Sequence, residues 1–125
     1  MEKIIVENIY KIFGRHPEKA MKMLNEGRKK DEIMRKTSQA VGVVDASFSV
    51  NEGETMVIMG LSGSGKSTVL RCINRLIRPT SGRIVVDGVD VTALPEDQLR
   101  DFRRHKFGMV FQRFALFPHR TVLEN

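Results

Sequence analysis

One short stretch constrains this chain more than any other: residues 60–68 read Gly-Leu-Ser-Gly-Ser-Gly-Lys-Ser-Thr. The spacing fits the pattern G-x-x-x-x-G-K-[ST] of a phosphate-binding loop, the P-loop. Its three glycines permit backbone conformations that side chains forbid, so that consecutive N–H groups can point at one anion. Lys66 is expected to reach the β- and γ-phosphates, and the Ser67 hydroxyl to bind Mg²⁺. The stretch therefore predicts a nucleotide site.

The flanks of the loop supply the context that such a site needs. Residues 55–59, Thr-Met-Val-Ile-Met, form a short apolar run that is typical of a strand buried on both faces. After the loop, apolar residues recur at helical spacing as far as the stop at Pro79: Val69, Leu70, Ile73, Leu76 and Ile77. The order strand, glycine loop, helix favours a nucleotide site over a flexible Ser/Gly loop, and it turns the positive helix N-terminus toward the phosphates.

Composition sets broad limits on the class of protein. A chain of 125 residues fits one small domain, and its 41% hydrophobic and 29% charged content is that of a globular protein. The net charge of +6 suits nucleic acid, anionic headgroups or a nucleotide and does not choose among them. Cys72, the only cysteine, excludes an internal disulfide and is expected to be a buried apolar residue. No apolar run approaches the roughly 20 residues of a membrane span, and no signal peptide is recognisable at the N-terminus, so a cytoplasmic start is expected.

The first half of the chain predicts two strands and an insertion. Residues 3–13 and 43–50 alternate as strands do, and the turn at 51–53 leads from the second strand into the apolar run at 55–59, which predicts a hairpin. Residues 15–39 carry eight Lys/Arg and four Asp/Glu, with a helix starting at Pro17 and a second short helix near Asp31. A solvated surface excursion and a partner-docking or regulatory element are both open for this insertion.

The second half predicts a hairpin, a helix and a further strand. Asp87-Gly88 lies between two apolar runs, which is a strong hairpin signal. The same aspartate ends an apolar run, as a Mg²⁺-binding Asp does in P-loop ATPases, but Gly88 follows it in place of a carboxylate, so the turn explains Asp87 better. Pro95 opens a helix, residues 106–112 return to strand, and a loop enters another helix at Thr121.

With these residues in view, the chain resembles the ATP-binding subunit of an ABC transporter over nearly its whole length. The P-loop is the Walker A motif, and residues 109–112 (Met-Val-Phe-Gln) with the segment from Phe114 to Asn125 look like the Q-loop and the family's next segment. The resemblance implies an α/β P-loop NTPase fold, the ABC nucleotide-binding domain. That fold has an N-terminal antiparallel β-subdomain and the start of a parallel RecA-like core, here with a charged helical insertion at about 15–39.

The resemblance also implies roles for individual residues. Phe13, with Tyr10 as the alternative, matches the aromatic that stacks on adenine. Gln112 would complete the Mg²⁺ shell or orient the attacking water. The implied catalytic residues are Lys66 and Gln112, and the implied metal ligands are Ser67 and Gln112. The implied nucleotide-binding residues are Phe13, Gly60, Ser62, Gly63, Ser64, Gly65, Lys66, Ser67 and Thr68.

Within the family, the chain is similar to the glycine betaine/proline importer ATPases. Residues 8–14, the insertion with His16-Pro17, Leu61 and residues 74–77 carry this likeness. It implies an ATPase that uses ATP and Mg²⁺ as a dimer to drive osmoprotectant import. An importer of another small solute, such as polar amino acids, and a soluble P-loop kinase or NTPase are the alternatives. A basic nucleic-acid module is a third interpretation. The basic residues Arg100, Arg103, Arg104 and Lys106 are instead expected to be solvated surface, because a nucleic-acid patch would want interleaved exposed aromatics.

The implied partners are those of that class. They are a transmembrane permease subunit, contacted near Phe117, Pro118 and His119, a second copy of the ATPase and, indirectly, a substrate-binding protein, with no nucleic acid. The implied location is peripheral, on the cytoplasmic face of the bacterial cell membrane. His16, His105 and His119 show no metal-ligand spacing.

Three further ABC elements do not occur in the 125 residues: a Walker B Asp-Glu, a signature segment and a switch His. Residues 61–65 imitate a signature sequence but already belong to the P-loop. We therefore expect residues 1–125 to be the N-terminal portion of one ABC ATP-binding domain. Because phosphoryl transfer needs several groups placed together, this portion alone should bind nucleotide weakly and hydrolyse none.

Overall fold

The computed structural model describes residues 1–113 and 115–125. Phe114, part of the segment that resembles the Q-loop region, lies outside the described residues. The chain divides into two compact units, residues 1–95 and 96–125, and each is described by itself. Over the described part of the chain, the helices are too short and too polar to cross a bilayer.

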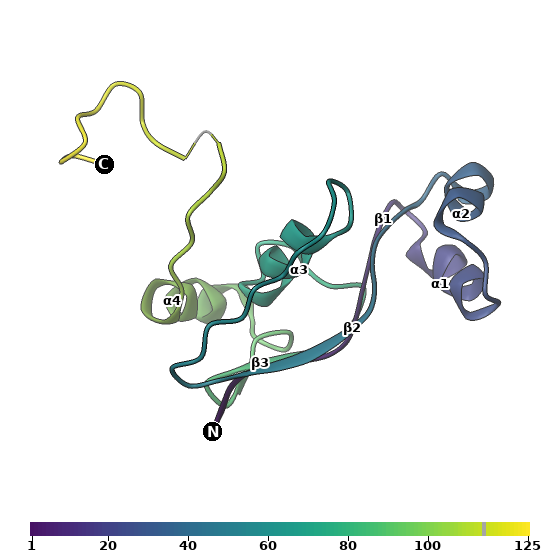
Figure 1. The fold of residues 1–125 in the computed structure, drawn as a ribbon, viewed down its shortest axis with the longest axis horizontal. Coiled ribbons are helices and arrows are strands. Elements are labelled where there is room, and N and C mark those ends of the chain that lie inside the picture. Colours follow the sequence, from purple (N-terminus) through teal and green to yellow (C-terminus); the bar gives the residue numbers. More distant parts are fainter. Residues whose placement is uncertain (114) are drawn as a thin grey trace. The chain divides into compact units, whose positions relative to one another are not determined.

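The first unit is built on a four-stranded sheet with the order β2-β1-β3-β4 (Figure 1). The central strand β1 (Glu2–Phe13) pairs antiparallel with β2 (Ala40–Asn51) on one side and with β3 (Ser81–Val86) on the other. The short β4 (Val89–Asp90) closes the β3 edge. This sheet confirms the predicted antiparallel β-subdomain.

The alternation of buried and exposed residues along β1 is interrupted within the strand. Val6, Ile9 and Ile12 are its buried residues, at most 2% exposed, and they are three apart rather than two. The register shifts between Val6 and Ile9, where Asn8 takes a positive φ of 50°. Its backbone N–H donates to the Ser47 hydroxyl over 2.8 Å in place of a regular ladder partner. This bulge moves the buried side of the strand by one residue, which simple alternation over residues 3–13 does not anticipate.

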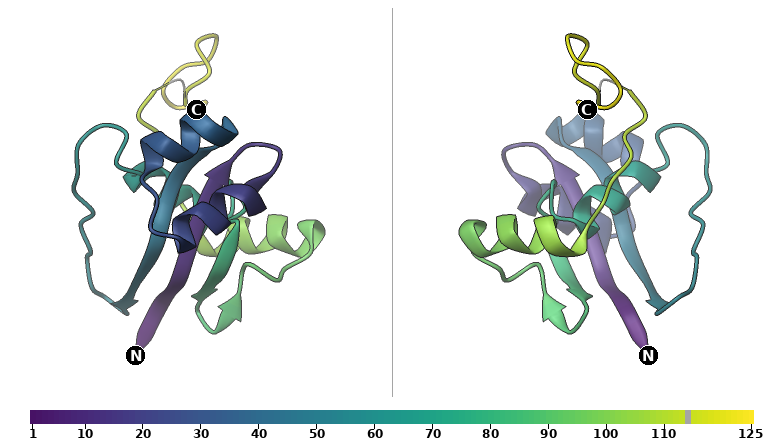
Figure 2. Two further views of the ribbon diagram at one scale, coloured as in Figure 1. Left: turned by 90° about the vertical axis from the view of Figure 1, so that its right-hand side faces the viewer. Right: turned by 90° about the vertical axis from the view of Figure 1, so that its left-hand side faces the viewer.

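The charged insertion forms two helices, as predicted: α1 (Pro17–Asn25) and α2 (Lys30–Thr37). They lie together at one end of β1 and β2 (Figures 1 and 2). A small apolar cluster of Ile12, Ala20 and Ile33, each at most 2% exposed, holds them there. The insertion is therefore packed on the strand ends through its apolar stripe, with most of its charged side chains in solvent.

The Asp87-Gly88 hairpin is confirmed. Both residues have positive φ, 53° and 79°, as a two-residue type I′ turn requires. The Asp87 N–H donates to the Lys3 carbonyl over 2.8 Å, and the Lys3 ammonium lies 3.2 Å from its carboxylate. This turn geometry supports the structural interpretation of Asp87 over the metal-binding one.

Two predicted strands are wrong. Residues 55–59 adopt no strand; of the predicted strand 106–112, Lys106 is the last residue of a helix and 107–112 adopt no strand. Within the described residues neither segment pairs with another strand. Figure 2 shows the segment from 51 to 65 running separately beside the β2 edge of the sheet. Without a neighbouring strand, the N–H and C=O groups of an extended segment have no backbone partner, so they hydrogen-bond with water. Val57, Met59 and Val110 are accordingly 72%, 86% and 97% exposed.

The helix after the P-loop, α3 (Lys66–Ile73), is shorter than the apolar spacing predicts. Its end is marked by Arg75, which has a φ of 56° and is only 5% exposed. The Arg75 guanidinium donates to the backbone carbonyls of Val91, over 3.0 Å, and of Leu94. Anchoring this side chain turns the backbone out of the helix, and Leu76 is left 49% exposed.

The second unit begins with α4 (Glu96–Lys106), which confirms the helix predicted after Pro95. Farther along, the ring of Phe117 lies 5.7 Å from that of His119, and the Phe117 N–H donates to the Asn125 side chain over 2.7 Å. The helix predicted at Thr121 is present only as one turn. Its Thr121 N–H donates to Glu124 over 2.8 Å and the Glu124 N–H to the Thr121 hydroxyl over 3.3 Å, the reciprocal pair of a capping box.

Candidate functional site

The P-loop needs its glycines for two reasons, a positive φ and the close approach of neighbouring atoms. Gly63 and Gly65 have φ of 81° and 97°, a region that favours glycine. A Cβ on Gly65 would lie 2.4 Å from the carbonyl oxygen of Gly42 in β2, and one on Gly60 would lie 2.5 Å from the Ser64 hydroxyl. The loop is therefore drawn tightly over β2 and folded closely on itself.

The loop delivers its lysine at the start of a helix. Gly65 is the N-cap of α3, and Lys66 is the first helical residue. The Lys66 ammonium donates to the Leu61 carbonyl over 3.0 Å, so that it lies over the loop. Ser67 and Thr68 occupy the first helical turn, where backbone N–H groups have no carbonyl partner within the helix. A phosphate placed here would meet an ammonium, a hydroxyl and the positive end of a helix together.

A hollow of about 290 Å³ opens beside this loop, close to the lower limit of ordinary ligand pockets. The described residues that line it come from α2, β2, the P-loop and the start of α3, and none of them carries a carboxylate. They are Lys30, Gly42, Val43, Val44, Ala46, Ile58, Met59, Ser64, Gly65, Lys66 and Val69. Six of these eleven residues are apolar, and the two charged ones are lysines, so the hollow combines an apolar wall with a positive charge that suits an anion.

Phe13, the predicted adenine platform, lies near this hollow. It is the last residue of β1, 40% exposed, and its ring is so close to Gly42 that a Cβ there would lie 2.8 Å from the ring edge. Gly42 also lines the hollow, so the ring and the P-loop approach the same strand residue. The alternative aromatic, Tyr10, pairs with Ser81 of β3. This placement favours Phe13 over Tyr10 as the platform, and stacking itself stays a prediction.

The predicted Mg²⁺ ligands fall in different units. The Ser67 hydroxyl is exposed in the first turn of α3, next to Lys66. A hydroxyl oxygen together with phosphate oxygens is a donor set that Mg²⁺ accepts, so this residue fits the ion. Gln112 belongs to the second unit, in an exposed segment outside any helix or strand, and its role stays a prediction. Within the described part of the chain, His, Cys, Asp and Glu side chains form no group of three that could hold a metal.

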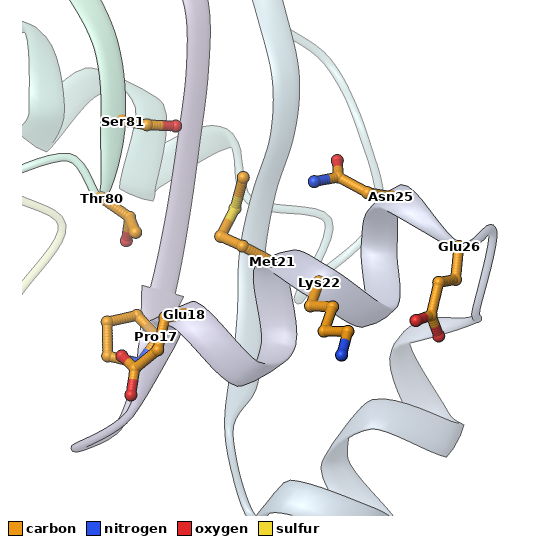
Figure 3. A pocket seen from close by; sticks show the side chains of 8 residues that line it. All are labelled: Pro17, Glu18, Met21, Lys22, Asn25, Glu26, Thr80 and Ser81. Carbon is orange, nitrogen blue, oxygen red and sulfur yellow. The ribbon is translucent and has the colours of Figure 1, made fainter.

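A second hollow, of about 630 Å³, lies between α1 and the start of β3 (Figure 3). Pro17 and Thr80 lie on opposite sides of it, and Met21 points from α1 toward the strands. The Thr80 hydroxyl accepts the Ile12 N–H over 2.9 Å, so this residue serves the fold. Acidic, basic and apolar side chains line this hollow, and its described residues provide no set of backbone N–H groups and a lysine directed at one point, as the P-loop does.

Sequence reasoning missed two residues of the P-loop site. Gly42 had a usable signal, because a glycine inside a strand pattern often marks the close approach of another backbone. Lys30 had none, because it is one of eight basic residues in a charged insertion and nothing in the local pattern distinguishes it. Only the packing of α2 on the end of the sheet places it beside the loop.

Cys72 lies in α3 and is fully buried, as predicted. Burial raises the pKa of its thiol, and the positive charge of Lys11 acts in the opposite direction. The thiolate is disfavoured, so the residue acts as a small apolar side chain behind the P-loop.

Comparison with known proteins places these features in a family. Residues 43–125 match the family model described as ABC transporter. The chain is 54% identical to the glycine betaine/proline betaine transport ATP-binding protein ProV of Escherichia coli K12, over 98% of the chain and 31% of that protein. It is 58% identical to the glycine betaine transport ATP-binding protein OpuAA of Bacillus subtilis 168, over 98% of the chain and 29% of that protein. The chain thus spans about a third of the length of these curated relatives.

The solved structures agree with the sequence matches. The ATP-binding cassette MJ0796, in a dimeric post-hydrolysis state bound to ADP and Pi, superposes with a TM-score of 0.75 at 31% identity. The match covers 97% of this chain and 44% of that one. The predicted fold class is thereby confirmed. With a family model covering most of its residues and a P-loop built as that family requires, the chain belongs to the ABC transporter family.

Proposed function

We propose that this chain is the nucleotide-binding part of an ATPase that powers an importer of glycine betaine and related osmoprotectants. The observation that carries the nucleotide site is the P-loop itself: Lys66 lies over a glycine loop at the start of α3, beside a positively charged hollow. What supports the solute class is identity of 52% to 58% over nearly the whole chain with relatives named for glycine betaine transport.

Each residue has a physical task in the proposed site. The N–H groups of residues 63–66 and the Lys66 ammonium bind the phosphates, and Thr68 lies near the α-phosphate. Ser67 would hold Mg²⁺, which would supply positive charge to offset that of the phosphates. Phe13 stacks on the adenine, since an exposed aromatic ring offers a flat apolar face. Gln112 orients water or completes the metal shell, because an amide can both donate and accept.

The proposed setting is a transporter complex at the cytoplasmic face of the cell membrane. The chain would act peripherally with a second copy of the ATPase and a permease, and indirectly with a substrate-binding protein. The permease contact is assigned to Phe117, Pro118 and His119. In this segment two rings lie together and Phe117 is 56% exposed, which leaves apolar surface for a partner.

Nucleotide binding is tested with a fluorescent ATP analogue on the 125-residue chain. Lys66→Ala should abolish measurable binding, because it removes the ammonium of the P-loop. Lys22→Ala, in the other hollow, is the matched control and should bind as the unchanged chain does. If the two variants behave alike, the P-loop is not the nucleotide site. Steep salt-dependent binding to DNA would instead support the nucleic-acid interpretation.

The solute is tested in cells whose betaine-importer ATPase is replaced by the polypeptide that carries this chain. Restored uptake of labelled glycine betaine under osmotic stress, lost with Lys66→Ala, supports the proposal. Uptake of a polar amino acid instead of betaine would assign the chain to another importer. ATP turnover without uptake of any solute would favour a soluble NTPase.

A further inference from the structure

The helical insertion contributes a basic residue to the P-loop hollow. Lys30, the first residue of α2, lines this hollow together with Ser64, Gly65 and Lys66. It comes from a segment separated from the P-loop by the whole of β2. The hollow is thus lined by one lysine from each of two elements that are far apart in sequence.

The surroundings of Lys30 leave its charge available. The first turn of α2 carries two acidic residues, Asp31 and Glu32. Glu32 is engaged by Arg28 and by Lys36, the latter at 3.1 Å, and within the described part of the chain Asp31 forms no ion pair with Lys30. Within residues 1–113 and 115–125, no ion pair engages the Lys30 ammonium, and the described lining of the hollow holds no carboxylate. Two lysines that line one small hollow repel each other through their charges, and a polyanion bound there would relieve that repulsion.

We propose that Lys30 is a second phosphate-binding lysine of the nucleotide site, supplied by the helical insertion. The proposal rests on the nucleotide site proposed above and deepens it by giving α1 and α2 a task. Residues Ile12, Ala20 and Ile33 hold the helices on the sheet, and this packing sets the position of α2. A lysine carries an ammonium with three donor hydrogens on a flexible stem of four carbons, so it can reach a phosphate in several geometries.

The ligand class is a nucleoside di- or triphosphate. A hollow of about 290 Å³ is small for a whole nucleotide, so it suits the phosphates, while the base extends toward Phe13 beside Gly42. Lys66 and Lys30 would then bind the phosphate chain from two directions. The first would come from the P-loop and the second from the insertion.

The test uses the full chain, fluorescent ATP and competition by unlabelled ATP and adenosine. Lys30→Gln should weaken ATP binding about three- to tenfold, the effect of losing one charge-assisted contact at a partly exposed site. Adenosine, which has no phosphate, should displace fluorescent ATP equally well from the unchanged chain and from Lys30→Gln. Lys30→Arg should restore most of the ATP affinity, since it keeps the positive charge.

Lys29→Gln is the matched control, because it removes the same charge one residue earlier from a side chain that does not line the hollow. It should change ATP affinity less than about twofold. Equal effects of the two glutamine variants, with Lys66→Ala still abolishing binding, would overturn the proposal and leave the nucleotide site standing. Unchanged binding in Lys66→Ala would refute the nucleotide site itself. Far-ultraviolet circular dichroism of each variant shows that α2 is retained.

Discussion

Replacing Gly65 by alanine should damage the P-loop more than the same change at Gly63. Both glycines have positive φ, 97° and 81°, so alanine at either position costs about 1–2 kcal/mol in backbone strain. They differ in their surroundings. A Cβ on Gly65 would meet the Gly42 carbonyl oxygen at 2.4 Å, whereas a Cβ on Gly63 has nothing within 4 Å.

The contact at Gly65 cannot be relieved by moving a flexible side chain, because the obstructing atom is backbone within β2. Pushing α3 away from β2 costs about 1–3 kcal/mol more, as overpacking does in protein interiors. We therefore expect losses of about 2–5 kcal/mol for Gly65→Ala and about 1–2 kcal/mol for Gly63→Ala.

Urea unfolding of the two variants measures the difference directly. With an m-value of about 2 kcal/mol/M, the midpoint of Gly65→Ala should fall about 0.5–1.5 M below that of Gly63→Ala. Gly65→Ala should also lose ATP binding, because the N-cap of α3 moves. Coincident unfolding midpoints for the two variants would refute the close approach of the P-loop to β2.

Three other changes test the fold around the site. Arg75→Met should cost about 1–3 kcal/mol for the buried Val91 carbonyl left without its donor, and less for the half-buried carbonyl of Leu94. Arg75→Lys should recover part of this loss, as urea midpoints will show. Hydrogen bonds from Lys36 and then Arg28 lower the pKa of Glu32. The ionised Glu32 carboxylate therefore stabilises α2 fully above the ordinary glutamate pKa, and this stabilisation is lost as the pH falls through the lowered value. An NMR titration checks this, and Arg28→Gln should raise the midpoint. The buried Cys72 thiol should resist Ellman's reagent until urea unfolds the chain, and rapid labelling of the folded protein would contradict its burial.

Much of the fold could be predicted because the signals are local. Pro17 and the acidic Glu18 mark a helix start within one turn of sequence, and α1 begins there. Asp87-Gly88 demands a type I′ turn from its own backbone preferences, and the hairpin forms there. These features depend on residues that are neighbours in the chain, so that no distant contact can easily change them.

The errors have a common cause in missing or distant partners. The apolar run at 55–59 is typical of a buried strand, but a strand exists only where other backbone pairs with it, and none of the described residues does so. The helical spacing after the P-loop continues past Ile73. The helix ends there because Arg75 is bound to carbonyls of a segment that comes after β4. Neither outcome is encoded in the local pattern.

The sequence alone determined the chemistry of the P-loop: three glycines, Lys66 and Ser67 at fixed spacing specify a phosphate-binding turn and then a helix. Tertiary structure decided what faces that turn. The bulge at Asn8 and the apolar cluster under α1 and α2 set the end of the sheet, and the packing there brings Lys30 and Gly42 beside the loop. A motif determines its own local conformation, whereas the residues that surround it depend on burial and strand pairing between residues far apart in the chain.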